Sequence, residues 1–155
     1  MTTALYWLVQ CLWGLPQTLL GLALLAVHRK DEHFFFHCAL VTRWQGRSSL
    51  SVGPFVFITG DPYFYPKVAD RMDMEEAKSR LLVHEYGHTI QSLVLGPLYL
   101  VLIGVPSTLW GFLPWCAKRR QQGPVSYFAF FTERWANAWG EKVTGKTSME
   151  QLLID

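Results

Sequence analysis

Five consecutive residues, His84-Glu85-Tyr86-Gly87-His88, combine side chains that can bind a metal ion and move a proton. They match the pattern H-E-x-x-H. On an α-helix of about 3.6 residues per turn, His84 and His88 lie one turn apart on one face, so both imidazoles can reach one Zn²⁺. Glu85 lies beside the metal, where a carboxylate can take a proton from a zinc-bound water. The segment therefore predicts a hydrolytic zinc site.

Two residues in the second half of the chain have the chemistry to complete such a site. A catalytic zinc ion usually takes three protein ligands and one water. Glu133 and Asn137 lie one turn apart on a predicted helix at residues 124–140, so they share a face. Glu133 can be the third ligand, and Asn137 can accept a hydrogen bond from the histidine nitrogen that faces away from the metal. The simpler alternative is a surface glutamate on an amphipathic helix.

The two motifs together, H-E-Y-G-H and then E-R-W-A-N, resemble those of the gluzincin clan of zinc metallopeptidases. The second motif is similar to that of membrane-embedded peptidases of the HtpX and CAAX prenyl protease type and of their small relatives, the minigluzincins. The resemblance implies zinc binding by His84, His88 and Glu133, with Glu85 as general base. The family usually has aspartate where this chain has Asn137, which is uncharged and should raise ligand basicity less. The resemblance covers about the second half of the chain. The whole chain is much shorter than the membrane peptidases.

The composition is typical of a membrane protein. The 155 residues suffice for one domain with a single core, 50% of them are hydrophobic, and 17% are charged. The formal net charge is +2 and the basic residues form no extended patch, so we expect no nucleic-acid partner. The 3 cysteines show no C-x-x-C spacing, which predicts neither a disulfide framework nor a second zinc site.

Residues 4–27 form the first long apolar stretch and carry no charged side chain. A bilayer takes about 20 helical residues to cross, so this stretch predicts a transmembrane helix. Gly14 and Pro16 interrupt it, but both residue types are tolerated in transmembrane helices. A cleaved signal peptide is disfavoured, because the start is not basic and no small-x-small site precedes Arg29. The alternative is a helix wholly buried in a soluble protein.

The second apolar stretch, residues 93–116, decides whether Glu133 can meet the histidines. A single crossing would leave His84 and Glu133 on opposite sides of the bilayer. Residues 104–107, Gly-Val-Pro-Ser, predict a turn near the middle, and a re-entrant hairpin would bring both ends to one face. Two full spans, with the Glu133 helix dipping back into the bilayer, are the alternative.

The positions of the positively charged residues indicate how the chain is oriented relative to the two sides of the bilayer. Arg29 and Lys30 follow the first stretch, Lys-Arg-Arg at residues 118–120 follows the second, and residues 1–6 carry no charged side chain. Because basic residues favour the cytoplasmic side, we expect an external N-terminus, one span, and a membrane-localised site that faces the cytoplasm.

Residues 33–59 predict a β-hairpin, with two strands rich in Phe, Val and Leu around a loop at residues 45–48. The gluzincin resemblance implies an edge strand beside the zinc helix that holds extended substrate through main-chain pairing. An ordinary two-stranded cover is the alternative. The zinc helix is expected at residues 73–95, with acidic residues in its first turn. The candidates for the substrate strand are Leu50, Val52, Phe55 and Phe57.

Residues 140–147, Gly-Glu-Lys-Val-Thr-Gly-Lys-Thr, match the phosphate-binding pattern G-x-x-x-x-G-K-[ST]. That loop works between a strand and a helix. Here a predicted helix precedes it and 8 residues follow it, so no βαβ unit fits and we expect no nucleotide. We expect instead that a helix ends at Gly140 or Gly145 and that a short terminal helix follows at residues 148–153.

Together these features predict a mostly α fold with a small β-hairpin, of the α+β class, in one integral membrane domain of residues 1–155. The zinc helix packs on the helix that carries Glu133. The predicted function is a zinc metallopeptidase that acts on a peptide or protein and contacts membrane lipid, with Glu85 passing the water proton to the leaving amine. The candidates for a donor that stabilises the oxyanion are Tyr63, Tyr65 and Tyr127.

Two other functions fit the same motifs. The protein can be a non-catalytic membrane binding or regulatory module whose zinc site is structural or vestigial. A structural zinc needs a fourth protein ligand, and the sequence offers none near either motif, which favours an enzyme. The other alternative is a zinc hydrolase of lipid-like amides or esters.

Overall fold

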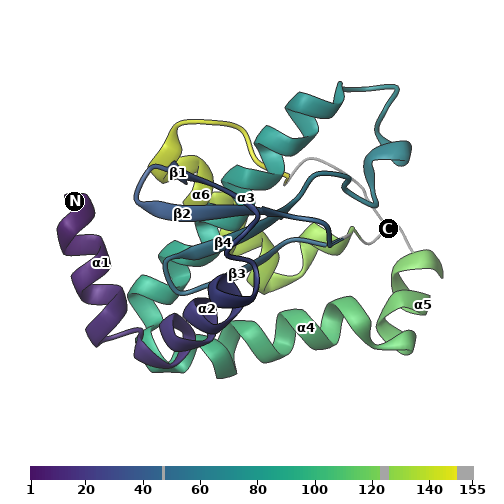
Figure 1. Ribbon diagram of the computed structural model, residues 1–155. Helices are drawn as coiled ribbons and strands as arrows, with labels where there is room; N and C mark the ends of the chain where they lie inside the picture. Colours follow the sequence, from purple (N-terminus) through teal and green to yellow (C-terminus); the bar gives the residue numbers. More distant parts are fainter. Residues whose placement is uncertain (47, 123–125, 150–155) are drawn as a thin grey trace.

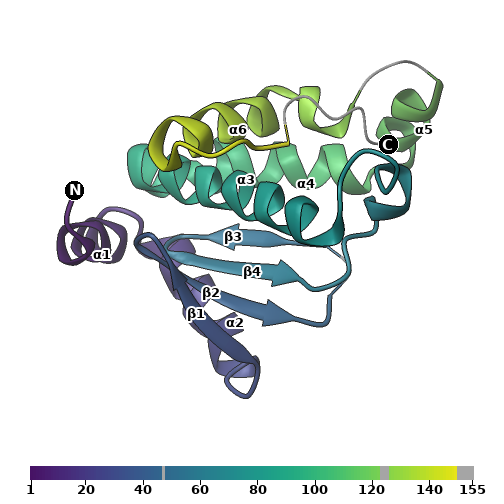
Figure 2. The same ribbon diagram turned by 90° about the horizontal axis from the view of Figure 1, so that it is seen from above.

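A small mixed β-sheet and a layer of helices make up the computed structural model, which is an α+β fold (Figure 1). The structure describes residues 1–46, 48–122 and 126–149. Figure 2 shows α3, α4 and α6 on one side of the sheet and α2 on the other. The helical elements, in chain order, are α1 (Thr3–Leu12), α2 (Leu15–Val27), η1 (Tyr65–Lys67), α3 (Met74–Leu95), η2 (Gly96–Leu98), the π turn η3 (Leu100–Gly104), α4 (Val105–Phe112), α5 (Pro114–Gln122), η4 (Tyr127–Ala129) and α6 (Phe131–Thr144).

The sheet has four strands in the order β1-β2-β4-β3. β1 (Glu32–Phe36) pairs antiparallel with β2 (Ala39–Trp44), β2 pairs parallel with β4 (Phe55–Thr59), and β3 (Leu50–Val52) pairs antiparallel with β4. The structure therefore has a mixed sheet where the sequence predicted one hairpin at residues 33–59. The parallel pair joins segments on either side of β3, and neither local periodicity nor a turn pattern reveals such a pairing. It leaves β3 at the edge of the described sheet.

Side chains of β4 alternate between the two faces of the sheet, as the pleat requires. Val56 and Ile58 belong to the core cluster that includes buried residues of α3. Phe55 and Phe57 belong to a second cluster, against which Leu24 of α2 packs. All five β4 residues are buried because helices cover both faces of this central strand.

The prediction of an integral membrane fold is wrong. In the part of the chain that the structure describes, no single helix is long and apolar enough to cross a bilayer. Residues 4–27 do not form one helix but α1 and α2, which are bent by 105° relative to each other. Pro16 lies in the first turn of α2, where its missing N–H has no helical partner to lose. Gly14 and Pro16 therefore divide the apolar stretch.

Buried glutamines hold this bend against the end of α3. Gln10 donates its Nε2–H to the Thr89 carbonyl oxygen at 2.9 Å and accepts from Ser92 Oγ at 2.9 Å. Gln17 donates to Ser92 Oγ at 3.0 Å and to the Gly96 carbonyl oxygen at 2.8 Å. A buried amide is costly unless it is hydrogen-bonded, and the end of α3 supplies these partners. A count of charged residues did not reveal the bend, because glutamine carries no charge.

Residues 93–116 also bend, but not where the sequence predicted. α3 ends at Leu95, Gly96 adopts φ 54°, and the helical path changes direction by 118° before α4. The predicted turn at residues 104–107 lies instead within continuous helical structure, where η3 passes into α4. α4 runs back along the helical layer (Figure 2), so the chain does reverse direction, but it does so after α3 and not at the predicted turn.

α3 and α6 approach closely because both carry residues with little or no side chain at their crossing. A Cβ added to Gly87 would collide with the backbone of Ala136. One added to Gly140 would collide with the carbonyl oxygen of Val83. The two helices lie side by side in both views, which places Glu133 next to the histidine-bearing turn of α3 (Figures 1 and 2).

The ends of α6 differ from the predicted bounds of 124–140. The helix begins at Phe131, and residues 124 and 125 lie outside the described part. It runs through Gly140 to Thr144, and Gly145 ends it in the left-handed conformation at φ 69°. Of the predicted terminal helix at 148–153, residues 150–153 lie outside the described part.

Candidate metal centre

Three buried side chains from two helices converge on one point. His84 and His88 project from α3 and Glu133 from α6, and their ligand atoms all lie within 4.8 Å of one another. The Nε2 atoms of His84 and His88 are 3.2 Å and 3.4 Å from Oε2 of Glu133. The 3.6-residue period of α3 sets the histidine pair, and the glycine crossing brings the carboxylate to it.

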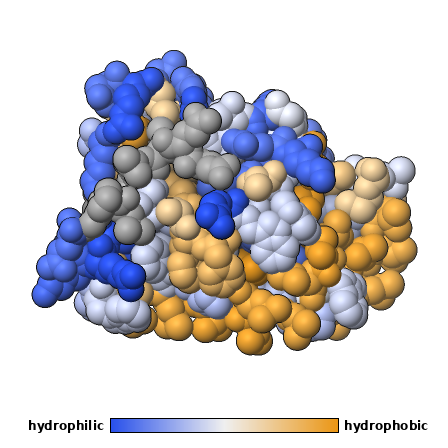
Figure 3. Space-filling view, turned by 180° about the vertical axis from the view of Figure 1, so that it is seen from behind, coloured by the Kyte–Doolittle hydropathy of each residue, from blue (hydrophilic) through white to orange (hydrophobic). Residues whose placement is uncertain are grey.

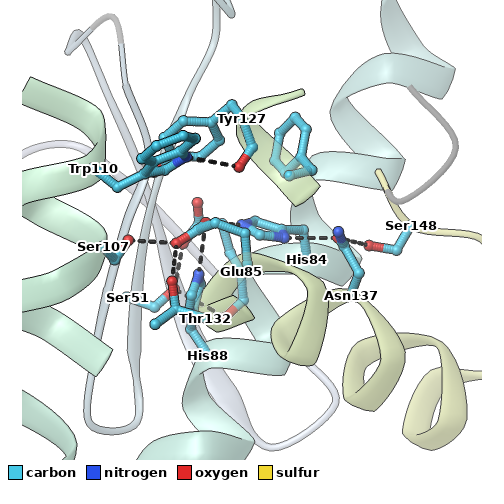
Figure 4. Close-up of polar contacts among 12 residues, drawn as sticks. Ser51, His84, Glu85, His88, Ser107, Trp110, Tyr127, Thr132, Asn137 and Ser148 are labelled. Atoms are coloured by element: carbon cyan, nitrogen blue, oxygen red, sulfur yellow. Dashed lines mark hydrogen bonds and ion pairs between the residues drawn. The ribbon is translucent and has the colours of Figure 1, made fainter. Parts of the chain in front are cut away.

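Hydrogen bonds orient both imidazoles so that Nε2 faces Glu133. His84 Nδ1 lies 2.8 Å from Oδ1 of Asn137, and His88 Nδ1 lies 2.7 Å from Oε1 of Gln91. An amide oxygen only accepts, so each Nδ1 carries the hydrogen and each Nε2 offers its lone pair. Figure 4 shows His84 and Asn137 joined in this way. This is the tautomer that a metal-binding histidine needs.

The Glu133 carboxylate is held by its other oxygen. Oε1 accepts from Ser107 Oγ of α4 at 2.5 Å and from Thr132 Oγ1 at 2.9 Å. Oε2 is thereby left for the two imidazoles. Two lone pairs and a carboxylate oxygen repel one another at such distances unless a cation lies between them or a proton joins them. The group of His84, His88 and Glu133 can therefore hold a metal ion.

The electrostatics of the metal-free cluster show how strongly it favours positive charge. Burial alone would lower the pKa of His88, but the neighbouring carboxylates of Glu133 and Glu85 outweigh it and raise that pKa to about 9. Burial alone would raise the pKa of Glu133, but His88 and His84 hold it well below its ordinary value. Without a metal, a proton on His88 supplies the charge that the carboxylate requires.

Glu85 lies beside the ligands and is anchored to the sheet. Its Oε2 is 2.6 Å from Ser51 Oγ on β3, and the same hydroxyl is 2.9 Å from the Glu85 carbonyl oxygen. Tyr99 donates its hydroxyl to the Ser51 carbonyl oxygen at 3.0 Å. Figure 4 shows the Glu85 side chain next to His84 and His88. A buried carboxylate in this place can exchange a proton with a molecule at the metal position.

A cavity of about 1050 Å³ opens over the cluster. His84, Glu85, His88 and Glu133 line it, together with η3, most of α4 and residues 48–52. A volume of this size holds a ligand of several residues or an equivalent small molecule.

The four predicted substrate-strand residues do not share one place. Leu50 and Val52 lie on the edge strand β3 and line the cavity. Phe55 and Phe57 lie on the inner strand β4, where they are buried against the α2 side. The predicted hairpin placed all four residues on one strand, because it assigned the whole of residues 49–59 to a single strand.

Of the three tyrosines predicted as oxyanion donors, Tyr127 has the best-defined setting. Its hydroxyl is hydrogen-bonded to Ser107, and burial together with Glu133 raises its pKa well above the ordinary value. Trp110 donates its indole N–H to the Tyr127 carbonyl oxygen at 3.0 Å (Figure 4). Tyr63 also lines the cavity, and Tyr65 is not among its lining residues. A tyrosine that stays protonated can donate a hydrogen bond at any physiological pH.

Of the polar groups that orient the ligands, the sequence indicated Asn137, which contacts His84 Nδ1, but not the others. Gln91 follows His88 by three positions, so helical spacing could have suggested it, and Thr132 directly precedes Glu133. The other three come from distant elements and carry no local signal. These three are Ser51, Ser107 and Ser148.

Comparisons of the chain with protein-family models, with curated proteins and with solved structures found no match. The likeness to gluzincins thus rests on the two motifs alone.

Proposed function

We propose that the protein is a zinc-dependent hydrolase of the metallopeptidase type that its motifs resemble. The observation that carries the proposal is the position of Glu85, a buried carboxylate that lines the same cavity as the ligand group. Two imidazoles and a carboxylate are a donor set that catalytic zinc takes. Among the described residues, no fourth Cys, His, Asp or Glu joins the group, which favours an open position over a closed structural site.

The side chains divide the chemistry between them. A bound zinc ion would polarise the substrate carbonyl and lower the pKa of water to about 7. Glu85 accepts the proton of the attacking water while Ser51 holds its Oε2, and then delivers that proton to the leaving amine. Tyr127 can donate its hydroxyl to the oxygen on which negative charge develops, in exchange for the hydrogen bond that it makes to Ser107. Asn137 and Gln91 keep the two histidine rings in position through their Nδ1 atoms.

The edge strand β3 is the part of the site that can bind an extended peptide. It has no partner strand on its outer side among the described residues, so main-chain pairing is possible there. The Ser51 carbonyl oxygen already accepts from Tyr99, so a peptide must pair around that contact or displace it. This strand favours a peptide substrate over a lipid-like amide or ester.

The test is hydrolysis of a quenched-fluorescent peptide library by the full-length protein loaded with zinc. The variant Glu85→Gln should lose at least about 100-fold of the rate, which is what removal of a general base costs, and should retain its zinc. The matched control is Glu76→Gln, an exposed acid two turns earlier on α3 that pairs with Arg80. Zinc content is measured in parallel by elemental analysis.

Three results would contradict the proposal. Peptide hydrolysis that survives Glu85→Gln removes the general-base role. Hydrolysis of lipid-like amides or esters with no action on peptides removes the peptidase class. A protein that binds zinc and hydrolyses neither class is a binding protein.

A further inference from the structure

The two N-terminal helices bury polar side chains and expose apolar ones, which is the reverse of the usual arrangement in a protein surrounded by water. Surface helices ordinarily bury an apolar stripe and expose polar side chains. Here Gln10, Gln17 and Thr18 are buried, whereas the exposed positions of α1 and α2 are apolar except for Thr3. Leu12 is 73% exposed. Such helices require an apolar partner on their outer side.

The segment from η3 to α5 has the same character. Val101 and Leu109 are exposed, and Phe112 is 78% exposed. Trp115 is exposed at the start of α5. Figure 3 shows hydrophobic side chains gathered along the lower edge and one side of the molecule, over the segments that include α4 and α1. Exposed hydrophobic residues therefore concentrate here instead of being scattered.

The two helical bends pack on each other, which joins both segments into one surface. Trp13 donates its indole N–H to the Val94 carbonyl oxygen at 3.4 Å, and Gln17 donates to the Gly96 carbonyl oxygen at 2.8 Å. Each contact links the break between α1 and α2 to the break after α3. We call the result the apolar face, represented by Leu8, Leu12, Leu19, Val101, Leu109 and Phe112.

The segments that carry the apolar face contain no acidic residue. Residues 1–30 and 86–132 contain no Asp or Glu. Arg29 and Lys30 are exposed after the end of α2, and Lys118 and Arg119 are exposed on α5. None of these four forms a salt bridge with another described residue. The apolar face is thus flanked by free positive charge.

We propose that the apolar face docks on the surface of an anionic lipid bilayer. Helices with an apolar side toward the acyl chains and basic residues at the headgroups bind such surfaces, and anionic lipid complements the charge. A second copy of the chain fits less well, because a two-fold contact would gather the basic residues of both copies at one interface whose segments carry no acid to pair with them. Trp13 and Trp115 are exposed and belong to the side-chain type enriched at lipid headgroups.

Docking would bring the cavity to the lipid. Val105, Leu109 and Phe112 of α4 line the cavity and are exposed, so the apolar face reaches the rim of the cavity. If the proposed hydrolase function holds, on which this step rests, the substrates are peptide segments presented at the bilayer surface. Vesicle binding itself needs no turnover, so it can be measured separately from the hydrolase activity.

The experiment is co-sedimentation of the full-length protein with vesicles of phosphatidylcholine and phosphatidylglycerol, compared with phosphatidylcholine alone. The double variant Leu12→Glu/Val101→Glu should bind at least about tenfold more weakly to both. The double variant Lys118→Gln/Arg119→Gln should lose about tenfold on the anionic vesicles only. The control Val143→Glu changes an exposed apolar residue of α6 and should bind like the wild type. Glu85→Gln should also bind like the wild type.

Far-UV circular dichroism and zinc content establish that each variant is folded. Wild-type protein that stays in the supernatant with both kinds of vesicle would overturn the proposal, as would equal binding by wild type and Leu12→Glu/Val101→Glu. A dimer in light scattering that this double variant dissociates, without any vesicle binding, would assign the apolar face to a second copy.

Discussion

Asn137 uses its side-chain oxygen but not its side-chain nitrogen for hydrogen bonds in the candidate site. Its Oδ1 accepts from His84 and from Ser148 Oγ, the latter at 2.5 Å. Its Nδ2 is buried and has no hydrogen-bond partner among the described residues. The motif that this chain resembles usually has aspartate here, whose second oxygen would need a donor that the site does not supply. The asparagine keeps the ring of His84 in place without adding a buried charge.

Two substitutions of Asn137 separate the effect of its acceptor oxygen on zinc binding from the effect of an added charge. Asn137→Ala removes the acceptor and should weaken zinc binding by about 10–100-fold, which is the usual effect of losing a partner of a metal ligand. Asn137→Asp keeps the acceptor and adds charge, so zinc affinity should equal or exceed that of the wild type. Competition with a chromophoric chelator measures both affinities. Wild-type affinity in Asn137→Ala would show that His84 does not depend on this contact.

Zinc binding should release a proton from His88. Its pKa in the metal-free protein is raised to about 9, so the ring is protonated at neutral pH and must lose that proton to bind metal. At about pH 7.5 we expect about one proton released per zinc ion, and affinity should fall about tenfold for each pH unit below about 9. Calorimetric titration in buffers of different ionisation enthalpy measures the release. Equal heats in all buffers would contradict it.

In the metal-free protein, His88 and Glu133 also make the stability of the fold depend on pH. The His88 contribution falls as pH rises, whereas zinc affinity rises. The pKa of His88 is raised above its ordinary value of 6.5, so its contribution to stability is complete below that value and is lost as pH rises through about 9. The pKa of Glu133 is lowered, so its contribution is present above its ordinary value of 4.5 and is lost as pH falls well below that. The pair therefore stabilises the metal-free fold most between the two ordinary values.

At the scale of elements, the contact between α3 and α6 decides whether the third ligand reaches the first two. Gly87 lies between the two histidines of the candidate metal site and meets the backbone of Ala136, so no side chain fits between the helices at this point. Glu133 lies one turn before Ala136 on α6. Any outward movement of α6 would therefore move the carboxylate away from the imidazoles.

Gly87→Ala should disrupt both the crossing and the metal centre. The added methyl group collides with backbone, which cannot rotate away, so we expect a loss of at least about 2 kcal/mol of unfolding free energy together with weaker zinc binding. Gly104→Ala is the matched control, because a Cβ there meets only ordinary contacts and gains about 1 kcal/mol or less in helix propensity. Chemical denaturation and zinc titration provide the two measurements. Normal zinc affinity in a folded Gly87→Ala protein would disprove the link.

At the scale of the whole molecule, the site joins most of the helical layer to the sheet. The ligands come from α3 and α6, Ser51 attaches Glu85 to β3, and Ser107 attaches Glu133 to α4. Ser148, beyond the end of α6, contacts Asn137. A metal ion at the centre would therefore stabilise the fold as a whole and not one helix.

Removal of the metal should lower the thermal stability of the entire chain. With zinc about 1,000-fold above its dissociation constant, linkage predicts a loss of about 4 kcal/mol on chelation. For a chain of 155 residues that is a fall in Tm of about 10 °C. Scanning calorimetry with and without chelator tests it, and addition of zinc should restore the transition. His88→Ala should respond to neither treatment, and an unchanged Tm in the chelated wild type would exclude a metal that couples the elements.

The sequence by itself determined the parts of the site that depend on helix geometry and on donor chemistry. His84 and His88 share a face because their spacing matches one turn, and the same spacing relates Glu133 to Asn137. These features follow from local periodicity, which a linear pattern records. Gly87 and Ala136, which carry little or no side chain, lie at the contact between α3 and α6.

Only the tertiary structure decided where the chain bends and which segments pair. Residues 4–27 resemble a transmembrane helix by hydropathy, but Gln10 and Gln17 find hydrogen-bond partners at the end of α3 and the stretch folds into two helices. The parallel pairing of β2 with β4 and the approach of Ser107 to Glu133 likewise join residues far apart in the chain. Such contacts are selected by packing and by the need to satisfy buried polar groups, and neither leaves a periodic signal in the sequence.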